Sequence, residues 1–414
     1  MLNPLFDTLP AYPFTGLNAL LQGVAPPPGY RPIDMAVGDP QHAAPPLLAD
    51  TVARHAADWN RYPPMSGTPE LRLAITEWLT RRYRLAPGTV SPDHHVAPLA
   101  GSREGIVLFA SLAIPRRKNG RRPVVLMPNP HFLIYNSAAT LAGAEPVFLP
   151  ARRNNGFLPD LDAIPAETLD RAALFYLCSP SNPEGSFADL EYLKRAIGLA
   201  RRHDFVLVVD ECYSEIYDRE PPPGALEACA ALGNGFDGVV VFHSLSKRSS
   251  AAGMRSAFAA GDPKLIGDFA RLRSYHGVHV PLPIQAAAAA LWRDERHVEE
   301  NRAKYRRKFD LAEGALAGKF GFYRPPGGFF LWLDVGDGEK AALRLWREAG
   351  LRALPGGYLA VAPNGADNPA RQYLRLALVH SEPTVEDACQ RIGRVLEPDV
   401  SAAVAKVRAE AITP

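Results

Sequence analysis

Cysteine is scarce in the sequence, and its few positions form no metal or disulfide pattern. The four cysteines are Cys178, Cys212, Cys229 and Cys389. No two of them form a C-x-x-C pair, and none has histidine neighbours at the spacing of zinc ligands. We therefore expect structural thiols in a reducing compartment and no metal site.

Long apolar runs and an excess of charge of one sign are also lacking. No segment has about 18 uninterrupted apolar residues, and residues 1–23 contain an acid and prolines where a signal peptide needs a basic start and an apolar core. The 46 lysines and arginines nearly balance the 44 acidic residues, leaving a net charge of +2. The sequence thus predicts a cytoplasmic protein that acts on small molecules, with no nucleic-acid or membrane partner.

Length and composition indicate a globular chain with more than one domain. The 414 residues exceed the usual domain size, and 47% of them are apolar while 22% are charged, which is close to globular averages. Repeats with a period of about 20 to 50 residues are missing, which excludes solenoids and propellers.

The middle of the chain alternates short apolar runs with longer helical patterns. Continuous Val, Leu and Phe residues indicate strands buried on both faces, as parallel strands are. The helical patterns at 101–114 and 189–203 carry apolar residues at three and four spacing. This alternation predicts an α/β domain with a mostly parallel sheet covered by helices. The predicted strands are 123–127, 174–178, 205–209, 239–242 and 256–260.

The pattern of apolar and polar residues changes after about residue 285, where long helical patterns precede the strand-like "FFLWLDV" and "YLRLALV". We expect a large domain over 46–285 and a smaller α+β domain over 286–414. Residues 1–45 are expected to form an N-terminal arm that belongs to the smaller domain.

Polar residues follow several of the predicted strands. Because ligands collect at the carboxyl ends of parallel strands, these residues are candidates for a common site. Each has an ordinary explanation by itself, such as a helix cap, a strand end or a surface lysine. The candidates are Asp210 and Tyr213 after 205–209, Asn182 after 174–178, and Ser244 and Lys247 after 239–242.

Together these residues match the requirements of one cofactor, pyridoxal phosphate. This cofactor needs a lysine for covalent attachment, a carboxylate at its ring nitrogen, donors at its ring oxygen and a phosphate cup. Lys247 fits the first role, and a buried Asp210 would stabilise the protonated ring nitrogen. Tyr213 and Asn182 would bond the ring oxygen.

A phosphate cup is predicted beside the lysine. The turn Gly101, Ser102 and Arg103 begins a helical pattern, so its backbone N–H groups and the helix dipole would favour an anion. Ser244 and Arg255 flank Lys247 and would add charge-assisted hydrogen bonds.

The motifs that contain these residues resemble those of the fold type I pyridoxal-phosphate aminotransferases. "SLSKRSSAAGMR" resembles the lysine motif of that family, and "VVDECYSEIY" its aspartate and tyrosine strand. "SPSNPEG" resembles its asparagine loop, and "AGSREGI" its phosphate-binding turn. The resemblance covers nearly the whole chain in the expected order.

Four further residues take their roles from this resemblance. In "MPNPHFLIY", Phe132 would stack on the cofactor ring, and in "AVGDPQH", Gly38 would lie near the substrate. In "RYPPMSGTPELRLAI", Tyr62 would reach the cofactor phosphate of the neighbouring subunit, which implies a homodimer. In "YLRLALV", Arg375 would bind the α-carboxylate of the substrate.

A narrower resemblance is to the N-succinyldiaminopimelate aminotransferases of bacterial lysine and cell-wall biosynthesis. It implies transfer of an amino group between glutamate and N-succinyl-2-amino-6-ketopimelate. Three positions depart from the pattern: Glu184 replaces a threonine, Ala257 a glycine and Val361 an arginine. An arginine at 361 would bind a second substrate carboxylate, so its replacement leaves the substrate open.

The expected chemistry uses Lys247 first as a nucleophile and then as a general base. Burial and the cation of Arg255 are expected to lower its pKa, which keeps some of the amine neutral. Three alternatives stay open from the sequence: an aminotransferase for another amino acid, a carbon–sulfur lyase on the same fold, and a non-catalytic sensor that binds the cofactor. A sensor would need an appended DNA-binding domain, and the short segment before residue 36 is neither long nor basic enough.

Overall fold

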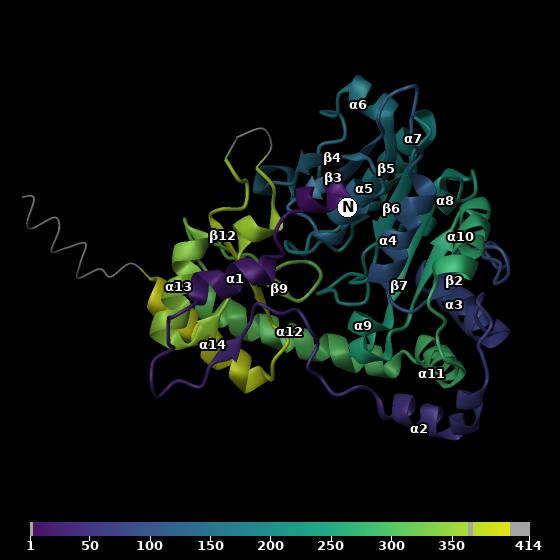
Figure 1. Ribbon diagram of the computed structural model, residues 1–414. Coiled ribbons are helices and arrows are strands. Elements are labelled where there is room, and N and C mark those ends of the chain that lie inside the picture. Colours follow the sequence, from purple (N-terminus) through teal and green to yellow (C-terminus); the bar gives the residue numbers. More distant parts are fainter. Residues whose placement is uncertain (1–2, 363–366, 398–414) are drawn as a thin grey trace, which may run out of the picture.

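The computed structural model describes residues 3–362 and 367–397. Figure 1 shows a large sheet flanked by helices, with the yellow-green C-terminal elements grouped beside it. The long helix α12 (Arg296–Leu316) runs from the large sheet region to the C-terminal group.

The large sheet has seven strands in the order β2-β8-β7-β6-β5-β3-β4. The neighbours from β4 to β7 run parallel, as the apolar runs predicted. Strand β8 instead runs antiparallel to both β7 and β2, so a parallel assignment of 256–260 is wrong. The strands are β2 (Val96–Leu99), β3 (Val124–Asn129), β4 (Glu145–Pro150), β5 (Ala172–Cys178), β6 (Val206–Asp210), β7 (Val239–Ser244) and β8 (Ala257–Gly261).

Helices cover both faces of this sheet, which explains why the strands lack polar alternation. Leu207 and Val209 of β6 belong to one core, whereas Val208 between them belongs to the other. The first core is closed by α3 (Pro69–Arg82), α7 (Leu190–Arg202), α8 (Ala225–Leu232) and α11 (Leu282–Arg293). The second is closed by α4 (Ser102–Ala113), α5 (Ile134–Leu141) and α10 (Pro263–His276). The remaining short helices in this region are α2 (Pro46–Arg54), α6 (Ala166–Arg171) and α9 (Leu245–Arg248).

The C-terminal part builds its own sheet and core. Its three antiparallel strands have the order β11-β12-β9, and a separate parallel pair joins β1 to β10. The β1 pair ties the N-terminal segment to a strand more than 300 residues later. The strands are β1 (Ile33–Asp34), β9 (Phe330–Asp334), β10 (Leu351–Arg352), β11 (Leu354–Pro355) and β12 (Tyr373–Ala377), and the helices around them are α1 (Pro13–Leu21), α12, α13 (Gly338–Ala349) and α14 (Glu382–Leu396).

The observed architecture confirms the predicted fold class, a mostly parallel, helix-covered sheet with a smaller α+β unit. In an open sheet of this kind, ligands bind outside the carboxyl ends of the parallel strands. The segments after β5, β6 and β7 meet at that edge, because these three strands are adjacent and parallel.

Candidate active site

A cavity of about 460 Å³ lies where these strands end, a size suited to a small-molecule ligand. Its wall combines the large sheet, the N-terminal segment and strand β12. Most of the side chains predicted from the sequence line it: Gly38, Ser102, Arg103, Phe132, Asn182, Asp210, Tyr213, Ser244, Lys247, Arg255 and Arg375.

Lys247 lies on the single-turn helix α9, which directly follows β7. Ser244 begins this turn by accepting a hydrogen bond from the Ser246 amide at 3.1 Å. The Lys247 Nζ donates to the carbonyl oxygen of Gly38 at 2.6 Å. Burial is the main reason that the pKa of Lys247 is lowered to about 8; the cations Arg375 and Arg103 act in the same direction, whereas Asp39 opposes the shift. The cations that contribute to the lowering are these two arginines rather than the predicted Arg255.

Asp210 ends strand β6 and is 5% exposed. The Tyr135 hydroxyl donates to its Oδ2 at 2.9 Å, and the Cys212 amide donates to its Oδ1 at 3.2 Å. Burial raises the pKa of this carboxyl group. Within the described residues no lysine or arginine forms an ion pair with Asp210, so a cationic ring nitrogen in the cavity would give it a partner.

Tyr135 is a site residue that the sequence-based reasoning missed. Its hydroxyl orients the Asp210 carboxylate, and its ring stacks on Tyr176 with centroids 4.7 Å apart. Its position three residues after Phe132 could have indicated it, because this spacing places two aromatic residues on one face of a helical turn.

The predicted phosphate cup is built from the start of α4 and from Arg255. Gly101 has a φ of +120°, and a Cβ on it would lie 2.1 Å from an Nη2 of Arg255. Only glycine therefore allows the guanidinium to approach this turn. The cationic group, the N-terminus of α4 and the Ser244 hydroxyl together suit a phosphate.

Arg375 is held in a preformed orientation on β12. Its Nη1 donates to Asn182 Oδ1 at 2.9 Å, and its Nη2 donates to the carbonyl oxygen of Ala36 at 2.8 Å. The Phe330 ring supports the guanidinium at 4.4 Å, and in the described part of the chain Nε has no partner. Burial lowers the pKa of Arg375 to about 10, so it stays charged at neutral pH. A fixed cation with free donors is suited to a carboxylate.

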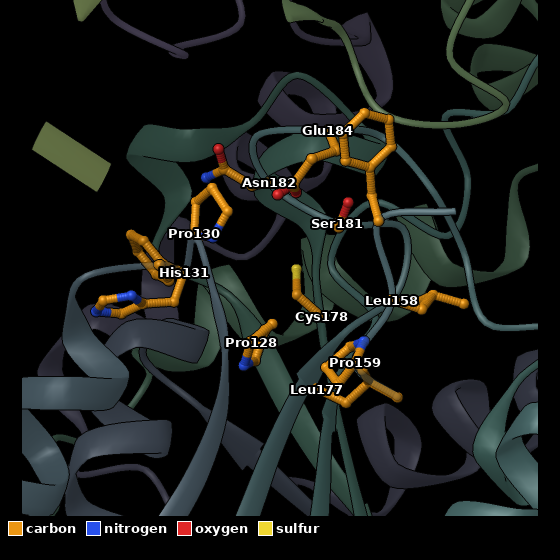
Figure 2. Close-up of a pocket in the computed structure, with 12 residues that line it drawn as sticks. Pro128, Pro130, His131, Leu158, Pro159, Leu177, Cys178, Ser181, Asn182 and Glu184 are labelled. Atoms are coloured by element: carbon orange, nitrogen blue, oxygen red, sulfur yellow. The ribbon is translucent and has the colours of Figure 1, made fainter. Parts of the chain in front are cut away.

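A second pocket of about 10 Å³, room for roughly one water molecule, lies beneath the asparagine loop. Figure 2 shows Asn182 and Glu184 of this loop at its upper edge and Cys178 below them. Glu184 is 2% exposed, and across the described residues its Oε1 has no hydrogen-bond partner. Burial raises the pKa of Glu184 to about 8, so this carboxyl group is mostly neutral at pH 7.

Tyr62 is the predicted residue that the structure places away from the cavity. Its side chain is 99% exposed. The other exposed apolar residues near it include Trp59, Tyr275 and Val278. Their segments adjoin, because His279 Nδ1 lies 3.0 Å from the Pro63 carbonyl oxygen. The expected contact between Tyr62 and the phosphate is therefore not made within one chain.

Two kinds of feature are absent from residues 3–362 and 367–397. This part of the chain contains no group of three or more His, Cys, Asp or Glu side chains placed to hold a metal ion. It also contains no helix that is long and apolar enough to cross a membrane.

Comparisons with known proteins agree on one family. The family model described as aminotransferase class I and II matches residues 31–392. The chain is 34% identical to 4-dedimethylamino-4-oxo-anhydrotetracycline transaminase OxyQ of Streptomyces rimosus, over 87% of this chain and 92% of that protein. It is 30% identical to the LL-diaminopimelate aminotransferase of Nitratidesulfovibrio vulgaris, over 94% of this chain and 97% of that protein. The crystal structure of an aminotransferase from Neisseria meningitidis matches with a TM-score of 0.91 and 36% identity, covering 96% of this chain and 100% of that one.

Proposed function

The chain belongs to the aminotransferase class I and II family, which depends on pyridoxal phosphate, and we propose that it moves an amino group between glutamate and N-succinyl-2-amino-6-ketopimelate. The motifs around Lys247, Asp210 and Arg375 support this assignment through their resemblance to the N-succinyldiaminopimelate enzymes. A relative is named for LL-diaminopimelate, which is also a long amino acid with a carboxylate at each end. We assign the reaction to lysine and cell-wall biosynthesis in the cytoplasm.

One observation carries the proposal: Lys247, Asp210 and Arg375 line a single cavity although they come from three distant segments. When bound, the cofactor supplies an electron sink for the bonds at the substrate Cα. Lys247 would hold the cofactor, and its neutral amine, freed when the substrate amine takes its place, would take up the proton from the substrate Cα. Arg375 orients the α-carboxylate so that the Cα–H bond faces that amine.

The other predicted residues hold the cofactor in this proposal. Asp210 would accept a hydrogen bond from the protonated ring nitrogen, and Phe132 would pack against the ring face. Asn182 would donate to the ring oxygen through its Nδ2, because its Oδ1 already accepts from Arg375. Tyr213 shares that role, and the phosphate binds at Gly101, Ser102, Arg103, Ser244 and Arg255. The Gly38 carbonyl oxygen would accept a hydrogen bond from the Lys247 amine when that amine is not bonded to the cofactor.

Part of the cavity lining is apolar, which supports a substrate with a long methylene chain. This apolar part comes from the N-terminal segment and from residues 354–359, which begin with β11. The apolar lining residues are Tyr12, Phe14, Val37, Leu354 and Leu359. Such a surface favours aliphatic carbons over a short charged side chain.

We also propose that the active enzyme is a homodimer. A patch of exposed aromatic and aliphatic side chains on one face is typical of a protein interface. Tyr62, Trp59, Tyr275 and Val278 are exposed on two segments that adjoin through His279 and Pro63, and the occupant we assign to this face is a second copy of this chain. Tyr62 would then reach the phosphate bound by its neighbour.

The test is a half-reaction screen with the purified, cofactor-loaded protein. Glutamate is offered as donor, with N-succinyl-2-amino-6-ketopimelate, tetrahydrodipicolinate and common keto acids as separate acceptors. We expect the succinylated acceptor to give the highest kcat/KM and 2-oxoglutarate to appear in equal amount. Preference for another acceptor would overturn the substrate assignment, and release of ammonia and pyruvate from a cysteine conjugate would indicate the lyase instead.

A further inference from the structure

A buried lysine outside the cavity lacks the partner that such a charge usually has. Lys308 on α12 has 0% exposure, and in the described residues no carboxylate lies within ion-pair distance of it. Its Nζ donates instead to His42 Nε2 at 2.7 Å and to the carbonyl oxygen of Leu378 at 3.0 Å. Burial lowers the pKa of Lys308 to about 7, so an amine placed here without a carboxylate destabilises the fold, and a purely stabilising role explains Lys308 poorly.

His42 also contacts a second residue of α12, Asn301. Its Nδ1 lies 2.7 Å from Asn301 Oδ1. Burial lowers the pKa of His42 to about 4, so the ring is neutral at pH 7. Since Nε2 accepts from Lys308, the single ring proton resides on Nδ1 and is donated to Asn301.

Asn301 completes the path at the helix that carries Lys247. Its Nδ2 donates to the carbonyl oxygens of Lys247 at 3.2 Å and of Arg248 at 3.3 Å. Each hydrogen bond in this series therefore has one donor and one acceptor, from Lys308 through His42 and Asn301 to the Lys247 carbonyl oxygen. Asn301 and Lys308 are seven residues apart, which places them on one face of α12.

The other end of this network leads to the strand of Arg375. Leu378, the second acceptor of Lys308, follows β12 three residues after Arg375. Aromatic contacts also connect His42 to the cavity side: its ring lies 4.8 Å from that of Tyr305, and Tyr305 stacks on Phe329 at 5.3 Å. The Lys247 Nζ lies 5.3 Å from the centre of that Phe329 ring.

We propose that His42, Asn301 and Lys308 are positioning residues that fix the Lys247 backbone relative to strand β12. They would thereby keep the distance between the Lys247 amine and the Arg375 guanidinium constant. This inference rests on the proposed aminotransferase function. None of the three residues lines the cavity, so they act through Lys247 and not on the substrate. Small displacements of a reacting group lower rates strongly, which gives the network a function beyond stability.

The test compares Asn301→Asp and Lys308→Met with a control elsewhere in the small domain. Asn301→Asp keeps the size and the acceptor but removes the donor to Lys247. The control is Arg391→Met, because Arg391 is also a buried cation, bonded to Asp387 and to the carbonyl oxygens of Ala349 and Arg31. All variants are purified with cofactor and compared by thermal unfolding, steady-state kinetics and a pH titration of the visible absorbance band without substrate.

We expect kcat to fall by about 10- to 100-fold in both network variants, with KM for glutamate within about threefold, because Arg375 keeps its contacts. The pH midpoint of the absorbance band should move by about half a unit or more, whereas Arg391→Met leaves kcat and the midpoint unchanged. The groups that face Lys308, namely Lys304, Arg307 and Glu382, are the same in every protein, so they cancel in the comparison.

The network proposal fails if Asn301→Asp and Lys308→Met match the Arg391→Met control in both kcat and midpoint. It also fails if KM rises while kcat is preserved. The two proposals can be separated, because the absorbance titration needs no substrate. A wild-type protein that binds cofactor but transfers no amino group overturns the proposed function, while the midpoint shift still decides the role of the network.

Discussion

At the scale of single residues, Lys247 combines two properties that seldom occur together on a lysine. It is buried enough for its pKa to fall to about 8, yet its Nζ faces the cavity. We expect Lys247→Ala to lower kcat by about 10²- to 10⁴-fold, because both the covalent attachment and the proton carrier are lost. The exposed Lys264, which pairs with Asp268, provides the control variant Lys264→Ala. Steady-state transamination by Lys247→Ala at the control's rate would contradict the assignment.

Glu184 predicts a measurable pH dependence of stability. Burial raises its pKa from 4.5 to about 8, so the folded protein retains a proton that the unfolded chain releases between these values. The stabilising contribution is therefore complete below pH 4.5 and is lost as the pH rises through 8. Glu184→Gln mimics the neutral acid and removes this dependence.

The measurement is the free energy of unfolding by denaturant for wild type and Glu184→Gln at pH 5 and pH 9. Between pH 5 and pH 9, we expect the free energy of unfolding of wild type to fall by up to about 4 kcal/mol more than that of Glu184→Gln. The figure follows from about 1.36 kcal/mol per pH unit. Comparing the two proteins at each pH cancels the other ionisable groups. An equal change with pH in both would show that Glu184 is ionised in the folded protein.

Sequence reasoning located residues whose position follows from a strand end, such as Asp210 and Lys247. It missed Tyr135, His42 and Asn301, although His42 stands in the motif "AVGDPQH". The contact between His42 and Asn301 joins residues 259 positions apart. Such pairs depend on tertiary packing, which local spacing does not encode.

At the scale of elements, the asparagine loop requires a glycine behind its functional side chains. Gly185 has a φ of +75°, and a Cβ there would lie 2.4 Å from the carbonyl oxygen of Gly327. We expect Gly185→Ala to destabilise the protein by about 1 to 3 kcal/mol. By displacing Asn182 from Arg375, it should also lower kcat/KM by about tenfold.

The matched control is Gly198→Ala in the middle of α7, where a Cβ would have no atom outside its own helix within 4 Å. This change should stabilise the helix by about 0.5 to 1 kcal/mol and leave kcat/KM unchanged. Denaturant unfolding and steady-state kinetics on both variants check the pair. Wild-type stability in Gly185→Ala would mean that the loop adapts to a side chain.

The strands show what local pattern can and cannot predict. The runs that became β3, β5, β6 and β7 were recognisable because both of their faces are buried. The direction of β8 was not, since an antiparallel strand inside such a sheet is as apolar as its parallel neighbours. The two-residue pairing of β1 with β10 left no sequence pattern at all.

At the scale of the whole molecule, the cavity needs both parts of the chain. Lys247 and Asp210 come from the large sheet, whereas Arg375 comes from β12 and Gly38 from the N-terminal segment. The family resemblance, carried by the order of motifs along the chain, predicted that both parts contribute residues to one site. Local sequence patterns predicted two domains but not how the two domains pack against each other.

The proposed homodimer can be tested by combining two inactive chains. If Tyr62 acts on its neighbour's phosphate, a heterodimer of Lys247→Ala with Tyr62→Ala contains one site that is doubly damaged and one that is intact. Tyr62 is 99% exposed in the single chain, so its replacement should leave the fold unchanged. We expect heterodimers isolated with two affinity tags to have about half of the wild-type kcat, since symmetry gives two equivalent sites. Each homodimeric variant serves as control. A heterodimer no more active than the mean of the two homodimers would show that Tyr62 does not complete the partner's site.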